Sequence, residues 1–211
     1  PPYEFKIDFT EEYFNSTDYM KPGRQNVKPS FLGNHAIVAF AEDANGQISK
    51  TDAIQFHIVS DKIKSRPFQG KAHAIPGDIN PSMYDEGGQG VAYFDGTKGN
   101  AFGKATNWRM DEDVDCTPKG IGGVGYGEWL NFTVDIAEEG DYEVSFKYGT
   151  PAKREQSMLF LCDLKVVGSA KCLPQDVKYG WSARNTAKTV LRLPGGRHVI
   201  RLVLNGSYNF E

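Results

Sequence analysis

Residues 128–148, EWLNFTVDIAEEGDYEVSFKY, decide the fold class of this 211-residue chain. In each half of the stretch an apolar side chain occupies every second position, which is the period of a β-strand. The two sets are Leu130, Phe132, Val134 and Ile136, and then Tyr142, Val144, Phe146 and Tyr148. The polar segment 138–141 between them contains a glycine, which is typical of a turn. The stretch therefore predicts two antiparallel strands that share one buried face.

The same pattern recurs toward the C-terminus. Ile200, Leu202 and Leu204 alternate in the same way. Turns are expected at Asp163-Leu164-Lys165 and at Pro194-Gly195-Gly196. With 23 glycines and 11 prolines, the composition suits many short strands joined by turns. We therefore predict an all-β protein, an antiparallel β-sandwich of the jelly-roll type.

Charge and hydropathy exclude two classes of partner. The formal net charge is −3, with no basic cluster, so a protein that binds nucleic acid by neutralising phosphates is not expected. Uninterrupted apolar runs reach about six residues, whereas a membrane-spanning helix needs roughly 18 or more. We expect no nucleic-acid partner and no membrane span.

The three cysteines do not form a recognisable framework. Cys116, Cys162 and Cys172 contain no C-x-x-C pair and leave one cysteine over. We therefore predict no metal site. Cys162 and Cys172 are close enough in sequence to form a disulfide across a hairpin, but the spacing does not fix that geometry.

No catalytic group stands out. The four histidines are scattered singly, and no pair of carboxylates is identified as the converging pair that a glycosidase needs. The acidic segment 111–115 contains hard oxygen ligands for a cation, but it is also typical of a solvated loop. We therefore predict no catalytic residue in this chain.

A tryptophan and an amide remain as candidates for binding. Trp181 lies in the loop sequence Tyr179-Gly180-Trp181-Ser182, outside any alternating strand, and Asn209 lies in a second loop near the C-terminus. An exposed indole can cover one face of a sugar, and a neighbouring amide can both donate to and accept from its hydroxyls. The alternative is that Trp181 packs into the core of the sandwich.

Several short motifs between residues 75 and 211 occur in the order found in the family 6 carbohydrate-binding modules. They are Ile75-Pro76-Gly77, Tyr84 to Asp95, Gly99-Asn100, Arg109 with Asp113-Val114-Asp115, Gly127-Glu128-Trp129-Leu130, Gly140-Asp141-Tyr142, Leu193 to His198, and Tyr208-Asn209. This segment, about two thirds of the chain, resembles that family.

The resemblance implies that a sugar ring is held in a loop cleft between two aromatic rings. Trp181 corresponds to the loop tryptophan, Asn209 to an asparagine that hydrogen-bonds the sugar, and Gln89 to a polar cleft residue. Ile121 falls where the family usually has the second aromatic ring, a tyrosine. Tyr179 or Tyr126 could compensate, although Tyr126 corresponds better to a core aromatic.

The resemblance also implies a structural calcium ion held by a pair of glutamates shortly after the Ile-Pro-Gly stretch. This chain has Asn80-Pro81-Ser82 there, so two charged ligands are missing. Glu211 corresponds to a C-terminal acidic ligand, but one carboxylate binds calcium weakly. We expect no cofactor and poor retention of calcium.

Residues 1–60 resemble the latter half of a bacterial immunoglobulin-like domain, in Pro2-Tyr3-Glu4-Phe5 and in the segment 33–46. The Asn45-Gly46 pair predicts a hairpin between strands at 36–41 and 53–59, and residues 10–20 are a weak helix candidate. We therefore expect a partial immunoglobulin-like spacer at 1–60, a linker at 61–74 and a carbohydrate-binding module at 75–211.

These resemblances imply a non-catalytic module that targets a covalently linked glycoside hydrolase to a polysaccharide or oligosaccharide. They also imply a secreted or cell-surface bacterial protein, of which this chain would be a piece. Two alternatives remain open. One is a structural or adhesive β-sandwich with a degenerate sugar cleft, and the other is a glycoside hydrolase in its own right.

Overall fold

The computed structural model divides the chain into two compact units, residues 1–58 and 59–211. It describes four strands of the first unit, together with Asn45 and Gln47, and residues 65–183 and 185–211 of the second. The helix expected at 10–20 lies outside the described residues.

The described strands of the first unit form two antiparallel pairs. Strand β1 (Gly33–Ile37) pairs with β4 (Ile54–Ile58), and β2 (Phe40–Glu42) pairs with β3 (Ile48–Lys50). Asn45 lies in the turn between β2 and β3, so the predicted position of the turn is confirmed. The strand bounds differ, because the strands next to the turn are 40–42 and 48–50 rather than 36–41 and 53–59, and residues 54–58 pair with 33–37 further from the turn. The immunoglobulin-like assignment of this unit stays a prediction.

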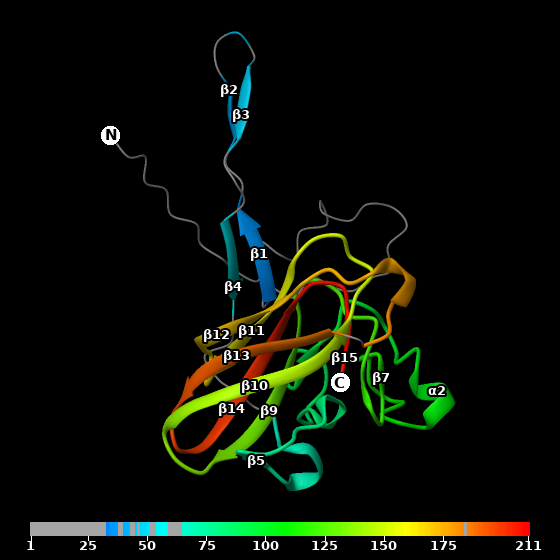
Figure 1. The fold of residues 1–211 in the computed structure, drawn as a ribbon, viewed down its shortest axis with the longest axis vertical. Helices are drawn as coiled ribbons and strands as arrows, with labels where there is room; N and C mark the ends of the chain where they lie inside the picture. Colours follow the sequence, from blue (N-terminus) through cyan, green and yellow to red (C-terminus); the bar gives the residue numbers. More distant parts are fainter. Residues whose placement is uncertain are drawn as a thin grey trace. The chain divides into compact units, whose positions relative to one another are not determined.

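The second unit is an antiparallel β-sandwich of two sheets, as the alternating pattern predicted. One sheet has the strand order β12-β11-β14-β9-β5, with β6 also paired to β9, and the other has the order β13-β10-β15-β8-β7. Figure 1 shows β10 and β13 side by side, with β14 and β9 in the other layer, and β15 next to the C-terminus.

The strands of the second unit are joined by turns and short helices. The first sheet consists of β5 (His73–Ile75), β6 (Tyr93–Phe94), β9 (Glu128–Ile136), β11 (Gln156–Cys162), β12 (Lys165–Cys172) and β14 (Gly196–Asn205). The second consists of β7 (Cys116–Thr117), β8 (Gly120–Ile121), β10 (Gly140–Gly149), β13 (Asn185–Leu193) and β15 (Asn209–Phe210). The helical turns are η2 (Phe68–Gly70), η3 (Pro81–Met83), α2 (Gly103–Thr106) and η4 (Val177–Tyr179). No helix among the described residues is long and apolar enough to cross a membrane.

Part of the segment expected as a linker belongs to the sandwich. Arg66 and Glu86 exchange backbone hydrogen bonds of 2.9 and 2.7 Å, and β5 pairs in parallel with β9. The second unit therefore extends to the N-terminal side of residue 75.

The alternating positions face the core as predicted, but β9 is buried on both faces. Leu130, Phe132, Val134 and Ile136 contribute to the main core. On the opposite face Asn131 is also buried. Its amide is satisfied there, since it donates to the Val91 carbonyl at 3.1 Å and accepts from Arg201. Asn131 and Thr133 are therefore structural rather than solvated, whereas Asp135, near the end of the strand, is exposed.

The structure argues against a Cys162–Cys172 disulfide. The turn between β11 and β12 has only two residues, so Cys162 pairs with Lys165 while Cys172 pairs with Gln156 at the other end of the hairpin. All three cysteines are free and buried. The turn predicted at Asp163-Leu164-Lys165 is where the structure has it, and that position puts the two cysteines at opposite ends of the hairpin.

The space between the two sheets is not completely filled. A cavity of about 490 Å³ is lined by inward-facing side chains of both sheets, among them Tyr142, Val144 and Phe146 of β10 and Phe210 of β15. These three β10 side chains are partly buried and pack against the main core.

Candidate functional site

Trp181 is presented on a short loop that is closed by its own backbone. The loop follows η4, and Ser182 N donates to the Tyr179 carbonyl at 3.0 Å. Gln175 Nε2 also donates to the Gly180 carbonyl, at 2.6 Å. Trp181 is 47% exposed, so it does not pack into the core. A large apolar ring therefore stands in solvent on a fixed support.

The amide of Asn209 lies between two loops. Its Nδ2 donates to the main-chain oxygen of Trp181 at 3.2 Å, and its Oδ1 accepts from Gly123 N at 3.1 Å. A primary amide has two N–H donors and two acceptor lone pairs, so one of each remains for another partner. The structure therefore brings Trp181 and Asn209 together.

Gly149 allows the Trp181 loop to approach the sheet. It pairs with Asn209 across β10 and β15. A Cβ atom at this position would lie 2.3 Å from the Ser182 carbonyl oxygen and 2.6 Å from that of Trp181. Only glycine leaves room for this approach, which puts the loop beside Asn209.

A second aromatic ring near Asn209 comes from an unexpected residue, Phe102. A Cβ atom on Gly122 would lie 2.6 Å from Phe102 Cε2 and 3.0 Å from Asn209 Oδ1, so both side chains lie against this glycine. Phe102 is 41% exposed. Its position outside any alternating strand, just before Gly103, is the only signal in the sequence that could have identified it.

The loop that carries Phe102 is held by acidic side chains. Asp115 Oδ1 accepts from Ala101 N at 2.6 Å, and Asp113 Oδ1 accepts from Gly99 N at 2.8 Å. Glu112 is paired with Arg109 at 2.8 Å. Two acidic side chains of segment 111–115 therefore support neighbouring backbone, and a third is paired with an arginine.

The other predicted site residues are placed differently. Tyr179 is 42% exposed in η4, two residues from Trp181. Ile121 is only 3% exposed and contributes to the core, so its side chain does not reach the surface where the second ring was expected. Gln89 is exposed, but its amide is bonded to the Asp95 backbone in both directions, at 2.8 and 3.0 Å. Tyr126, expected in the core, is 72% exposed.

Two buried carboxyl groups interact behind these loops. Burial, with a smaller contribution from Asp95, raises the pKa of Glu128 to about 7, and burial raises the pKa of Asp95 to about 6. Glu128 accepts from the backbone N–H groups of Gly96 and Gly125, at 3.0 and 2.8 Å. Glu128 and Trp129 are both buried in β9.

The residues in place of the implied calcium ligands do not suit that ion. Asn80 Oδ1 accepts from the backbone and hydroxyl of Ser82, at 3.0 and 2.8 Å. Its Nδ2 donates to the Pro118 carbonyl at 2.7 Å. The Pro118 oxygen, which could otherwise bind a cation, therefore already accepts a hydrogen bond from Asn80. A hard cation prefers several oxygen ligands, with charged carboxylates among them.

Known proteins give only distant structural matches. No family model and no curated protein sequence match the chain. A module named CsCBM6-3 from Clostridium stercorarium, in complex with cellobiose, is 12% identical with a TM-score of 0.48, covering 67% of this chain and 94% of that one. A family 6 carbohydrate-binding module studied by sub-site dissection is 16% identical with a TM-score of 0.44, covering 66% and 92%.

A cycloisomaltooligosaccharide glucanotransferase from Paenibacillus sp. is 17% identical with a TM-score of 0.37. The match covers 47% of this chain and 15% of the glucanotransferase. At these identities and TM-scores the similarities do not establish a family or a function for this chain.

Proposed function

We propose that the second unit is a non-catalytic carbohydrate-binding module that holds a polysaccharide or oligosaccharide at the Trp181 loop. The observation that carries the proposal is the pairing of a half-exposed indole with Asn209, whose Nδ2 is bonded to the Trp181 main chain at 3.2 Å. The indole covers one face of a pyranose, and the free N–H and lone pair of Asn209 bind its hydroxyls. Tyr179 and Phe102 flank the ligand.

The arrangement supports binding rather than bond cleavage. A glycosidase needs two carboxyl groups that reach the glycosidic oxygen and the anomeric carbon. The two carboxyl groups of Asp95 and Glu128 are almost completely buried and accept backbone N–H groups, so a sugar does not reach them. Gln89, with its amide used within its own loop, is at most a peripheral contact.

We propose that binding serves a covalently linked glycoside hydrolase in a secreted or cell-surface bacterial protein. Holding the polymer next to the catalytic domain raises the effective concentration of substrate without any new chemistry. The module itself needs no metal or cofactor for this role.

Affinity electrophoresis against a panel of β-linked plant and algal polysaccharides tests the proposal. We expect retardation in at least one polysaccharide gel and no release of reducing ends on incubation. Release of reducing ends by the isolated chain would favour the hydrolase alternative. Free migration in every gel would favour an adhesive sandwich with a degenerate cleft. The hydrogen bonds that Asn209 makes within the protein fit that alternative, because they use part of its donor and acceptor capacity.

A further inference from the structure

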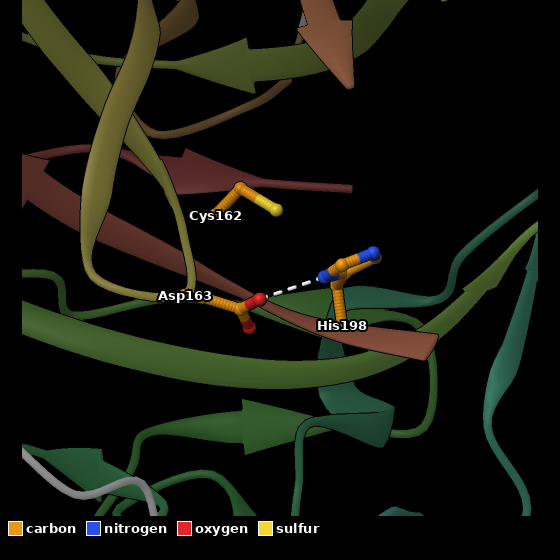
Figure 2. Close-up of side chains that lie close together, drawn as sticks. All are labelled: Cys162, Asp163 and His198. Carbon is orange, nitrogen blue, oxygen red and sulfur yellow. Dashed lines mark hydrogen bonds and ion pairs between the residues drawn. The ribbon is translucent and has the colours of Figure 1, made fainter. Parts of the chain in front are cut away.

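A cysteine, an aspartate and a histidine gather at one end of the sandwich, on elements outside the Trp181 and Asn209 loops. Cys162 ends β11, Asp163 begins the turn to β12, and His198 lies near the start of β14. Their possible ligand atoms all lie within 4.8 Å of one another. Figure 2 shows the Asp163 carboxylate and the His198 imidazole facing each other, with Cys162 beside them.

Strand register and a tight turn produce this grouping. Cys162 pairs with Ile200 across β11 and β14, and His198 is two residues from Ile200 on β14. The side chains of Cys162 and His198 therefore share one face of the sheet. Asp163 and Leu164 have φ values of 46° and 68°, as both residues of a two-residue type I′ turn require. The turn brings the Asp163 carboxylate back onto β14, where its Oδ1 accepts from Val199 N at 3.0 Å.

The hydrogen bonds of the imidazole place a positive charge between His198 and Asp163. His198 Nε2 lies 3.1 Å from the Gly195 carbonyl, which can only accept, so Nε2 carries a hydrogen. In the neutral ring Nδ1 then has a lone pair, and it lies 2.6 Å from Asp163 Oδ2, another acceptor. Two lone pairs at this distance need a proton or a metal ion between them. A carbonyl on the far ring nitrogen is also the usual support of a metal-binding histidine.

We propose that Cys162, Asp163 and His198 form a site for a zinc ion. The ligand atoms are Cys162 Sγ, Asp163 Oδ2 and His198 Nδ1, with water in the fourth position of a tetrahedron. Mixed sulfur, nitrogen and oxygen ligands select zinc over calcium or magnesium. Bonds of about 2.0 to 2.3 Å put the ligand atoms roughly 3.5 Å apart, so the site forms with shifts on the order of 1 Å.

Exposure and charge balance agree with this site. The Cys162 side chain is buried, while the side chains of His198 and Asp163 are 19% and 52% exposed, so the ion enters from solvent through the aspartate. Binding of the ion releases the thiol proton of Cys162. It also releases the Nδ1 proton of His198 when the imidazole is protonated. The bound ion then joins the β11–β12 turn to β14, which stabilises the sandwich independently of sugar binding.

Titration of the chelator-stripped protein with Zn²⁺ and Co²⁺ tests the proposal. We expect one equivalent of Zn²⁺ by calorimetry, a higher melting temperature with Zn²⁺, and a thiolate-to-cobalt charge-transfer band with Co²⁺. Cys162→Ser abolishes that band, and His198→Gln weakens Zn²⁺ binding by at least about 100-fold. Cys172→Ser is the matched control, because it removes a buried thiol from the other end of the same hairpin and leaves the band unchanged.

Three results would overturn the site. They are no Zn²⁺ uptake at neutral pH, Co²⁺ binding without a thiolate band, and equal loss of the band in the Cys172→Ser control. If Cys162→Ser does not fold, His198→Gln and Asp163→Asn still decide, because both residues are partly exposed. Polysaccharide retardation is measured separately, so failure of the metal site and failure of the proposed sugar site are distinguishable.

Discussion

Replacing Trp181 by alanine removes the stacking surface while leaving its support in place. Asn209 is bonded to the main-chain oxygen of residue 181, and alanine retains that oxygen. The turn around Gly180 is held by backbone groups and by Gln175, which the substitution also retains. We therefore expect the fold and the position of Asn209 to stay unchanged.

The size of the effect follows from the exposed area of the ring. A tryptophan side chain has up to about 250 Å² of surface, and at 47% exposure about 120 Å² remains open to solvent. A pyranose that lies flat on it covers roughly 100 Å², which at about 25 cal/mol per Å² is worth about 2.5 kcal/mol. The dissociation constant of the glycan should therefore rise by nearly two decades.

Calorimetry with the best polysaccharide of the panel measures the loss. Tyr126→Ala is the matched control, because Tyr126 is an aromatic residue, 72% exposed, that does not contact the ligand in the proposed function, although the resemblance offered it as a substitute for the second ring. The melting temperatures of both variants should equal that of the parent chain. Unchanged affinity in Trp181→Ala, or an equal loss in Tyr126→Ala, would show that the sugar binds elsewhere.

Three further predictions concern the support of the site, the buried acids and calcium. Gly149→Ala forces the Ser182 backbone away from β10, so glycan affinity should fall and the free energy of unfolding should drop by about 1–3 kcal/mol; unchanged values in calorimetry and urea unfolding would contradict the close approach. Burial raises the pKa of Glu128 to about 7, so the folded state binds more protons than the unfolded state between about pH 5 and pH 8. The free energy of unfolding should therefore fall as the pH rises through this range, by about 3 kcal/mol at most. Glu128→Gln should flatten that profile, and an equally steep slope in the variant would assign it to other groups. Calcium should leave the melting temperature unchanged, because the Asn80 amide occupies the Pro118 carbonyl; a strong rise would reveal ligands other than Asn80.

The strand pattern was predictable because it depends on local alternation. The sets that begin at Leu130, Tyr142 and Ile200 lie in β9, β10 and β14 as expected. Burial on the outer face of β9 was not predictable, since it depends on Asp85 and Ala92, which reach this strand from a distant loop.

Residues of the candidate site were predictable where a side chain stood outside the alternation. This was true of Trp181, but Phe102 was missed because its closeness to Asn209 depends on the missing side chain of Gly122. Ile121 was misplaced, since a position inferred by resemblance does not reveal that β8 turns this side chain inward. The grouping of Cys162 with His198 depends on strand register, which the spacing of cysteines alone does not encode.

The two residues of β15 face opposite environments. Asn209 points to the loops of Trp181 and Gly123, and Phe210 lines the cavity between the sheets. A mutation that repacks the hollow interior around Phe210 therefore also displaces the amide offered to a ligand. During evolution, recognition and interior packing would have to change together at this strand.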